Sequence, residues 1–552
     1  MILNLLIATV DEPLGGSSVK LIIWGTLIIS AGLWLNLVQA NAHATPQTEV
    51  GGTANSPATI QDLRKAADAG DTKAMFKIGV LYYDGQGVVQ DYRQAMVWFR
   101  KAGDAGVAEA MYNVGVLYND GRGVAQDYGQ AMVWYRKAAN AGNAWAMFNI
   151  GGLYSDGDGV PQDYQQAMAW YRKATDAGDA DAVYNIGALY ANGRGVPQDY
   201  HQAMACYRVA ATADIAEAMY NIGVLYANGQ GVVQDYQQAM AWYRKAADAG
   251  NTDAMTNIGT LYRDGHGVPQ NYQQAIYCYR EAATLGSANA MDNMGFLYAI
   301  GEGMAQDYQE AFAWFRKAAD AGNTDAMGNI GFMYENGQGV ARDYQEAMVW
   351  YLKAADAGVA SGMYNVGVLF ANGQGVTQDY QQALSWYRKA ADAGDALAMF
   401  NIGGLYHSGE GLAQDDQHAM YWFRKSAEAG DSQAMLALGV GYENGQGVIQ
   451  DNQQAMTWYH RSADSGNTGA MNNIGAMYEN GHGVPQDYQQ AMAWYRKAAD
   501  GGNTWAMKNI GSLYANGQGV AQDHQQALSW YRKAADAGDV NAKKLLADLD
   551  AK

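Results

Sequence analysis

An asparagine side chain recurs at intervals of 36 residues along this 552-residue chain. It stands directly before an Ile-Gly, Val-Gly or Met-Gly pair in 11 of 13 copies of a repeated unit. A row of carboxamides, each with two N–H donors and one carbonyl acceptor, could bind the backbone of an extended peptide. The alternative, which we favour, is a structural hydrogen bond between neighbouring copies, because a helical wheel places this position at the edge of the core. The candidate residues are Asn113, Asn149, Asn185, Asn221, Asn365 and Asn401.

The residue directly before this asparagine position is aromatic in seven copies, and we call it the aromatic position. We expect its side chain to face outward, where a strip of rings could bind a peptide, a glycan or a partner helix. The rings could instead pack between adjacent helices, and both interpretations stay open. The seven residues are Phe76, Tyr112, Phe148, Tyr184, Tyr220, Tyr364 and Phe400. The other copies carry Thr256, Asp292, Gly328, Leu436, Asn472 and Lys508.

Patterns typical of metal, redox or nucleophilic chemistry are weak. Asp156–Gly159 resembles part of a calcium loop but lacks the further ligands and the closing glutamate. Cys206 and Cys278 lie two whole copies apart, beyond disulfide reach, and His266 and His482 are six copies apart. The recurring methionines fall on the apolar arcs of helices, which favours core packing over copper binding. We therefore predict no catalytic residues, no metal, no cofactor and no enzymatic activity.

All these positions belong to a 36-residue unit that is repeated 13 times without insertion or deletion. A fixed period of this length is typical of a solenoid, in which each repeat buries its apolar face against its neighbours. The glycine that follows the asparagine and the apolar residue sets the register. It occurs at Gly79, Gly115, Gly151, Gly187, Gly223, Gly259, Gly295, Gly331, Gly367, Gly403, Gly439, Gly475 and Gly511.

The copy at residues 253–286 predicts two helices that would position these side chains. Residues 253–263 have one apolar face, and Gly259 lies on it, which suggests a close helix–helix approach rather than flexibility. Gly265 is placed to end the first helix in the left-handed conformation. Asn271, where other copies have Asp, is an N-cap for the second helix, and Gln274 would complete a capping box.

This unit resembles the Sel-one-like repeat, a longer-looped relative of the tetratricopeptide repeat. The resemblance rests on the G-x-x-Y of Gly223–Tyr226, the glycine loop Gly229–Gly231 and the A-x-x-W-Y-x-K-A-A of Ala239–Ala247, and it covers about residues 58–550. It implies an all-α protein, a right-handed α/α superhelical solenoid of 13 full helix-pair repeats with terminal capping helices and with its first helices on the concave side. It also implies a scaffold for protein–protein interaction, frequently in bacterial envelope or secreted proteins, with no common catalytic residues.

The N-terminal region has the pattern of an export signal. Lys20 precedes an apolar run at residues 21–35, and the small-x-small triplet Ala42–Ala44 follows. We predict a cleaved signal peptide over residues 1–44, with translation starting at Val19 as a hypothesis, and an uncleaved membrane anchor as the weaker alternative.

The rest of the chain divides by the repeat. Residues 45–57 are a polar linker, residues 58–72 a capping half-repeat, residues 73–539 the array, and residues 540–552 a C-terminal capping helix.

Charge and composition limit the class of partner. The formal net charge of −19 argues against a nucleic-acid backbone as ligand, because phosphate binding needs a basic patch. We predict a bacterial periplasmic or secreted monomer, without membrane contact beyond the signal segment. It would bind a protein or peptide along the concave face and act as an envelope scaffold. The alternatives are a factor that binds or modifies cell-wall glycan and a secreted effector that binds a host protein.

Overall fold

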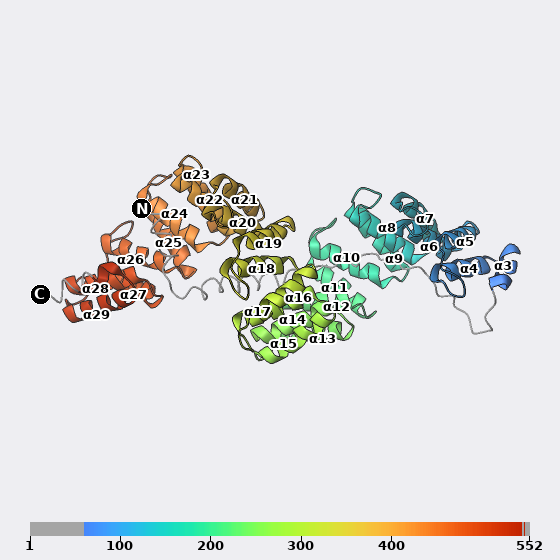
Figure 1. The fold of residues 1–552 in the computed structure, drawn as a ribbon, viewed down its shortest axis with the longest axis horizontal. Coiled ribbons are helices and arrows are strands. Elements are labelled where there is room, and N and C mark those ends of the chain that lie inside the picture. Colours follow the sequence, from blue (N-terminus) through green and yellow to red (C-terminus); the bar gives the residue numbers. More distant parts are fainter. Residues whose placement is uncertain (1–59, 544–545, 547–552) are drawn as a thin grey trace. The chain divides into compact units, whose positions relative to one another are not determined.

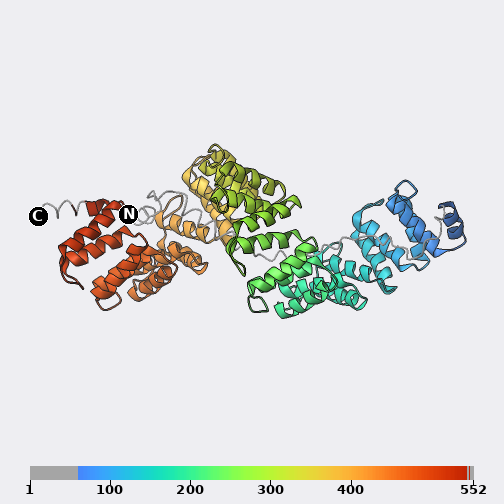
Figure 2. The same ribbon diagram turned by 90° about the horizontal axis from the view of Figure 1, so that it is seen from below.

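The computed structural model describes residues 60–543 and residue 546, and its regular elements within these residues are helices. Figures 1 and 2 show them as consecutive pairs. The first helices of the 13 repeats are α4 (Thr72–Asp84), α6 (Ala108–Asp120), α8 (Ala144–Asp156), α10 (Ala180–Asn192), α12 (Ala216–Asn228), α14 (Thr252–Asp264), α16 (Ala288–Ile300), α18 (Thr324–Asn336), α20 (Ala360–Asn372), α22 (Ala396–Ser408), α24 (Ser432–Asn444), α26 (Thr468–Asn480) and α28 (Thr504–Asn516).

The second helices of the repeats are α5 (Tyr92–Asp104), α7 (Tyr128–Asn140), α9 (Tyr164–Asp176), α11 (Tyr200–Ala211), α13 (Tyr236–Asp248), α15 (Tyr272–Thr284), α17 (Tyr308–Asp320), α19 (Tyr344–Asp356), α21 (Tyr380–Asp392), α23 (Asp416–Glu428), α25 (Asn452–Asp464), α27 (Tyr488–Asp500) and α29 (His524–Asp536). Within each unit, a second helix packs against the first helix of its own repeat and against the first helix of the next, as α5 does with α4 and α6. This arrangement confirms the predicted helix-pair solenoid.

The array forms two compact units. The first includes the described residues up to Met294 together with Glu302–Met304, and the second includes Gly295–Gly301 and the described residues from Ala305 onward. Both units contain hydrophobic clusters of similar composition, and each of these clusters joins the two helices of a repeat to the first helix of the next. In the fifth repeat, for example, Ala239, Met240 and Tyr243 of α13 are buried against α12 and α14.

The turn between the two helices of a repeat is built from glycine and a capping aspartate. In the fifth repeat Gly229 and Gly231 have φ of 67°, a left-handed conformation that costs glycine little. Asp235 then begins α13, and its Oδ1 accepts hydrogen bonds from the backbone N–H groups of Gln237 and Gln238. The predicted N-caps and glycine stops are therefore confirmed.

The predicted capping box is wrong in one respect. The Asn271 side chain accepts from the Gln274 backbone N–H, as expected for an N-cap. A capping box also needs the Asn271 backbone N–H to bond to the Gln274 side chain. That N–H instead donates to the Tyr262 carbonyl of α14 at 2.8 Å, so it is not available to the Gln274 side chain.

The recurrent glycine of the first helix is a packing residue, as predicted. A Cβ placed on Gly223 would lie 2.6 Å from both Cδ1 and Cε1 of Tyr243 on the paired helix. Real Cβ atoms do not approach a ring so closely, so a side chain here would push α12 away from α13.

At the ends of the array, α3 (Ile60–Asp68) precedes the first full repeat and buries Leu63 and Ala67 against Trp98 of α5. Residues 540–543 are helical. The predicted signal peptide and linker lie outside the described residues. In the part of the chain that the structure describes, no helix has the length and apolar character needed to cross a membrane.

Candidate interaction surface

The asparagine ladder joins neighbouring repeats in the first unit. Nδ2 of Asn149 donates to the Tyr112 hydroxyl at 3.4 Å, and Nδ2 of Asn221 donates to the Tyr184 hydroxyl at 3.3 Å. Each bond runs from one first helix to the preceding one. The favoured interpretation, a structural hydrogen bond between repeats, is therefore confirmed for these two residues.

The remaining predicted asparagines differ in exposure. Asn113 and Asn185 are buried in the first unit, whereas Asn365 and Asn401 in the second are half-buried. Peptide binding by this row remains a prediction, and the half-buried pair on α20 and α22 has the more accessible carboxamides.

The aromatic position does not face outward as expected. Tyr184 is 1% exposed, Phe76, Tyr112 and Tyr220 are also buried, and the other three rings of the set are half-buried. Each of the seven rings packs against a ring of the second helix of its own repeat rather than between first helices alone. The centroid distances are 5.7 Å for Phe76–Phe99, 5.8 Å for Tyr112–Tyr135, 5.7 Å for Phe148–Tyr171, 5.6 Å for Tyr184–Tyr207, 5.8 Å for Tyr220–Tyr243, 5.9 Å for Tyr364–Tyr387 and 5.4 Å for Phe400–Phe423.

The helical wheel misjudged this position because it treats each helix as packed on one side only. Each first helix has its paired second helix on one side and the preceding and following repeats on others. The apolar arc is therefore wider than that of an isolated helix pair, and it includes the aromatic position. Burial also raises the pKa of Tyr364 to about 12.

The second helices carry a ladder of cation–π pairs that we did not predict. The Lys245 Nζ lies 4.2 Å from the centroid of the Trp242 ring, and eight other repeats have the same Lys–Trp pair at 3.6–4.3 Å. The sequence holds a signal for it. Where Trp is replaced by Cys206 or Cys278, the lysine three residues later is replaced too, by Val209 and Glu281.

The neighbouring arginine links one repeat to the next. In the fifth repeat, Nη2 of Arg244 donates to the Tyr262 hydroxyl of α14 at 3.1 Å, and Arg100 and Arg208 bond in the same way to the tyrosine 18 residues later. The recurrent Arg-Lys pair is thus a packing feature, in addition to its favourable place near a helix C-terminus.

The hydroxyls of the core tyrosines on second helices are satisfied in different ways. Tyr351, Tyr459 and Tyr495 donate to a glutamate of the paired first helix at 2.6–2.7 Å. Those glutamates, which are Glu335, Glu443 and Glu479, occupy one position of the repeat. The hydroxyls of Tyr135, Tyr207 and Tyr243 are buried and have no hydrogen-bond partner among the described residues.

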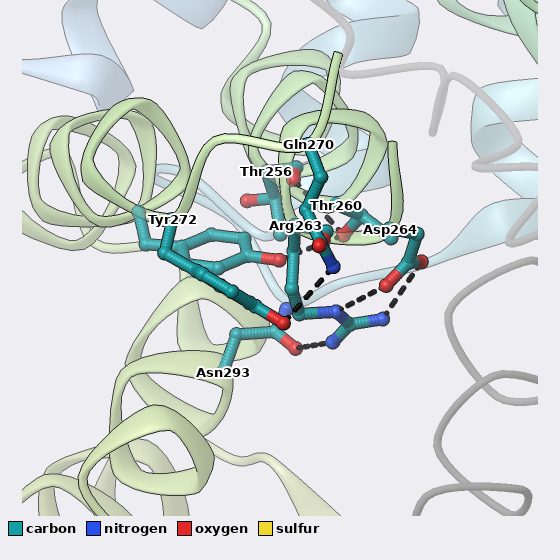
Figure 3. Close-up of polar contacts among 8 residues, drawn as sticks. Thr256, Thr260, Arg263, Asp264, Gln270, Tyr272 and Asn293 are labelled. Atoms are coloured by element: carbon teal, nitrogen blue, oxygen red, sulfur yellow. Dashed lines mark hydrogen bonds and ion pairs between the residues drawn. The ribbon is translucent and has the colours of Figure 1, made fainter. Parts of the chain in front are cut away.

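The sixth repeat places a buried cation at that same position. Arg263 forms a bidentate pair with Asp264, with Nε to Oδ1 at 2.7 Å and Nη2 to Oδ2 at 3.0 Å, and its Nη1 donates to Asn293 Oδ1 at 3.4 Å (Figure 3). Thr260 bonds to the Tyr279 hydroxyl at 3.1 Å in the same cluster. Because its donors are directed at residues of α14 and α16, Arg263 joins two repeats of the first unit and is not presented to solvent.

Four residues of each first helix form a stripe along one face. In α10 they are Asp181, Asn185, Ala188 and Asn192, spaced by four, three and four residues. The stripe begins at the second residue of the helix, and we call this position the exposed end of the first-helix stripe. It is Trp145 in α8, which is 45% exposed, and Trp505 in α28, which is 43% exposed.

Carboxylates occupy the position of Trp145 in several other first helices. The second residue is acidic in α6, α10, α12 and α14, as Glu109, Asp181, Glu217 and Asp253. Burial, and to a smaller degree the neighbouring Glu217, raises the pKa of Asp181. The like charges of adjacent helices are therefore close enough to repel, and this end of the stripe has a negative field.

Groups that could hold a metal are not evident within residues 60–543, where no three His, Cys, Asp or Glu side chains lie suitably together. Cys206 and Cys278 are free thiols, and burial raises the pKa of both.

Comparison with family models matches the Sel1 repeat over nearly the whole array. The matched segments are residues 72–107, 108–143, 146–179, 180–214, 216–251, 252–287, 288–323, 324–359, 360–395, 396–431, 432–467, 468–503 and 506–539. A comparison with curated proteins found no match.

Two solved structures are similar to this chain. One is a protective antigen present in uropathogenic Escherichia coli strains, which displays an SLR fold. It has 34% sequence identity, covers 80% of this chain and 96% of its own, and has a TM-score of 0.46. The other is a Sel1 repeat protein from Oxalobacter formigenes. It has 38% identity, covers 45% of this chain and 99% of its own, and has a TM-score of 0.42.

Proposed function

The chain belongs to the Sel1 repeat family, and we propose that it is a non-catalytic scaffold that binds a protein partner along its first helices. Proteins of this kind typically bind other proteins. The observation that carries the proposal is the exposure of Trp145 on a first helix, whereas nine of the recurrent tryptophans on second helices are covered by a lysine. Exposed tryptophans are enriched at the energetic centres of protein interfaces.

The surroundings of Trp145 specify the chemistry of the partner. Its ring lies 6.0 Å from that of Tyr112, so the indole is held on one side and open on the other. Glu109 and Asp181 occupy the same position in the adjacent repeats. A partner segment with an apolar side chain for Trp145 and a Lys or Arg beside it would complement both features.

The proposed location is the bacterial periplasm or the outside of the cell. It is supported by the apolar run at residues 21–35 and the Ala42–Ala44 triplet that follows. N-terminal sequencing of the protein recovered from periplasmic and medium fractions tests it. A chain that stays in the cytoplasm with residue 21 intact would overturn it.

Crosslinking and affinity capture with the exported chain test the scaffold proposal. Trp145→Ala should abolish capture of the partner, because the anchor is lost, and thermal unfolding of the variant checks that losing the contact with Tyr112 leaves the chain folded. Tyr277→Ala is the matched control, since Tyr277 is a 61% exposed aromatic on the second helix α15. The proposal fails if both variants capture the same partner as the native chain, or if cell-wall glycan is recovered and no protein.

A further inference from the structure

A small hollow with several polar groups in its lining opens on the first-helix stripe between the third and fourth repeats. It is lined by Ser155, Tyr171, Asn185, Ala188, Leu189, Asn192 and Arg194. These residues come from α8, α9, α10 and the turn after α10. Its size corresponds to about one water molecule, so it admits the end of a side chain and not a whole one.

Two positions in the lining of the hollow carry small residues where some other repeats have larger ones. Ala188 stands where the second and fifth repeats have Val116 and Val224. Ser155 stands where the sixth and eighth repeats have Arg263 and Glu335. A larger side chain at either position would occupy the space.

An unsatisfied acceptor lines the hollow. Asn185 is 4% exposed, and its Oδ1 has no hydrogen-bond partner among the described residues. The Asn185 side chain is hydrogen-bonded to the Tyr171 hydroxyl, which also lines the hollow, and this bond leaves Oδ1 without a partner. Leaving a buried carbonyl oxygen unpaired costs about 1–3 kcal/mol, so a ligand that supplies an N–H donor is favoured.

The rim of the hollow supplies the complementary groups. Arg194 is exposed at the rim, with its guanidinium 5.5 Å from the Tyr164 ring, and Asn192 is half-buried beside it. Both side chains can donate to a carbonyl oxygen. Asn185 Oδ1 at the buried end of the hollow thus needs a hydrogen-bond donor from the ligand, and Asn192 and Arg194 at the rim can donate to an acceptor of the ligand.

We infer that this hollow binds the primary carboxamide of an Asn or Gln side chain on the partner. The NH2 group would enter and donate to Asn185 Oδ1, and the carbonyl oxygen would accept from Asn192 or Arg194 at the rim. A carboxylate has no proton to donate to Asn185, and an ammonium group would lie beside the Arg194 cation.

This inference deepens the proposed function and rests on it for the peptide context. Trp145 and Ser155 lie at opposite ends of α8, ten residues or about 15 Å apart along the helix. An extended partner segment could therefore place an apolar side chain on Trp145 and a carboxamide in the hollow, four to five residues away.

The test uses the full chain with labelled Leu methyl groups and small probes in place of the partner. Propionamide reproduces the Gln side chain beyond Cα, propionate reproduces that of Glu, and butanone has the carbonyl without the N–H. Propionamide should shift the Leu189 methyl resonances saturably, and the other two probes should not. Equal shifts with propionate or butanone, or no shift with propionamide, would overturn the inference.

Three variants give the matched controls. Asn185→Leu removes the acceptor, and Ala188→Val fills the hollow with a residue that is native at this position in five other repeats. Both should abolish the propionamide shift in chains whose helical circular dichroism and unfolding temperature show that they are folded, a check that Asn185→Leu requires because it also removes the bond to Tyr171. Asn221→Leu alters the equivalent residue of the next repeat, whose Oδ1 is also unpartnered, and should leave the shift unchanged. A shift that persists in the folded Ala188→Val variant contradicts the assignment.

The two proposals can fail separately. If the Leu189 shift is specific for propionamide but Trp145→Ala still captures the partner, the hollow binds carboxamides and the first-helix scaffold proposal is wrong. If Trp145→Ala loses the partner but propionamide has no effect, the scaffold proposal stands and the carboxamide inference is wrong.

Discussion

Gly403 of α22 lies directly against the ring of Phe423 of α23, so that a Cβ on Gly403 would be 2.6 Å from Cδ1 and Cε1 of that ring. The next residue, Gly404, has no atom within 4 Å of the place its Cβ would take. Two adjacent glycines in one helix therefore have opposite roles. The first permits helix contact, and the second leaves the helix less stable than alanine would.

This difference predicts opposite effects of one substitution. Gly403→Ala should lower the free energy of unfolding by about 1–3 kcal/mol, because the new methyl overlaps the ring. Gly404→Ala should raise it by up to about 1 kcal/mol, the helix preference of alanine over glycine. Thermal and urea unfolding of the two variants measures both. Equal effects of the same sign would contradict the close approach.

The Lys245–Trp242 pair predicts an energetic coupling. A double-mutant cycle with Lys245→Ala and Trp242→Ala should give a coupling energy of about 0.5–2 kcal/mol, as for a partly desolvated cation over an indole. The sixth repeat is the control. Glu281→Lys alone should change the free energy of unfolding little, because Cys278 offers no ring. Glu281→Lys together with Cys278→Trp should create a coupling energy like that of the fifth repeat. A zero coupling energy in the fifth repeat would show that the pair is a neutral surface contact.

Asp179 predicts a dependence of stability on pH. It is 7% exposed at the start of α10, and burial raises its pKa from 3.8 to about 6. The folded chain therefore holds this proton more tightly than the unfolded chain does. The free energy of unfolding should fall as the pH rises from about 4 through about 6, by about 2–3 kcal/mol from this group.

Asp179→Asn isolates that contribution. Asn143 and Asn251 cap α8 and α14 at the same position of the repeat, so the cap should survive the change. Relative to the native chain, the variant should gain stability at pH 7 and gain none below about pH 4. If the difference between the two chains does not vary with pH, the carboxyl of Asp179 is not desolvated.

The Tyr459–Glu443 hydrogen bond of 2.6 Å predicts a context-dependent cost. Glu443→Ala should destabilise the chain by about 1–3 kcal/mol, because the buried Tyr459 hydroxyl loses its acceptor. In a Tyr459→Phe background the same change should cost much less. Phenylalanine is native at this position in Phe99, Phe315 and Phe423, so the background is expected to fold. Calorimetric unfolding of the four chains decides, and equal costs in both backgrounds would contradict the interaction.

The repeat, its helices and most of its turns and helix caps follow from local chemistry and could be predicted. Gly229 is needed where the chain turns left-handed, Asp235 where a helix begins with unpaired N–H groups, and Gly223 where two helices meet. Each requirement acts within one repeat or on the helix beside it. Because each requirement recurs every 36 residues, it can be recognised from the sequence alone.

The candidate site was less predictable, because exposure depends on how several helices enclose one position. A wheel for α10 could not reveal that Tyr184 packs on Tyr207 and is covered by the next repeat. Nor could it reveal the hollow at Asn185, which is lined by residues of three helices, among them Ser155, Tyr171 and Ala188. The sequence by itself determined the period, the helix ends and the close glycine contacts. Only the tertiary structure decided which side chains remain open, because burial is a property of packed neighbours and not of the pattern along one helix.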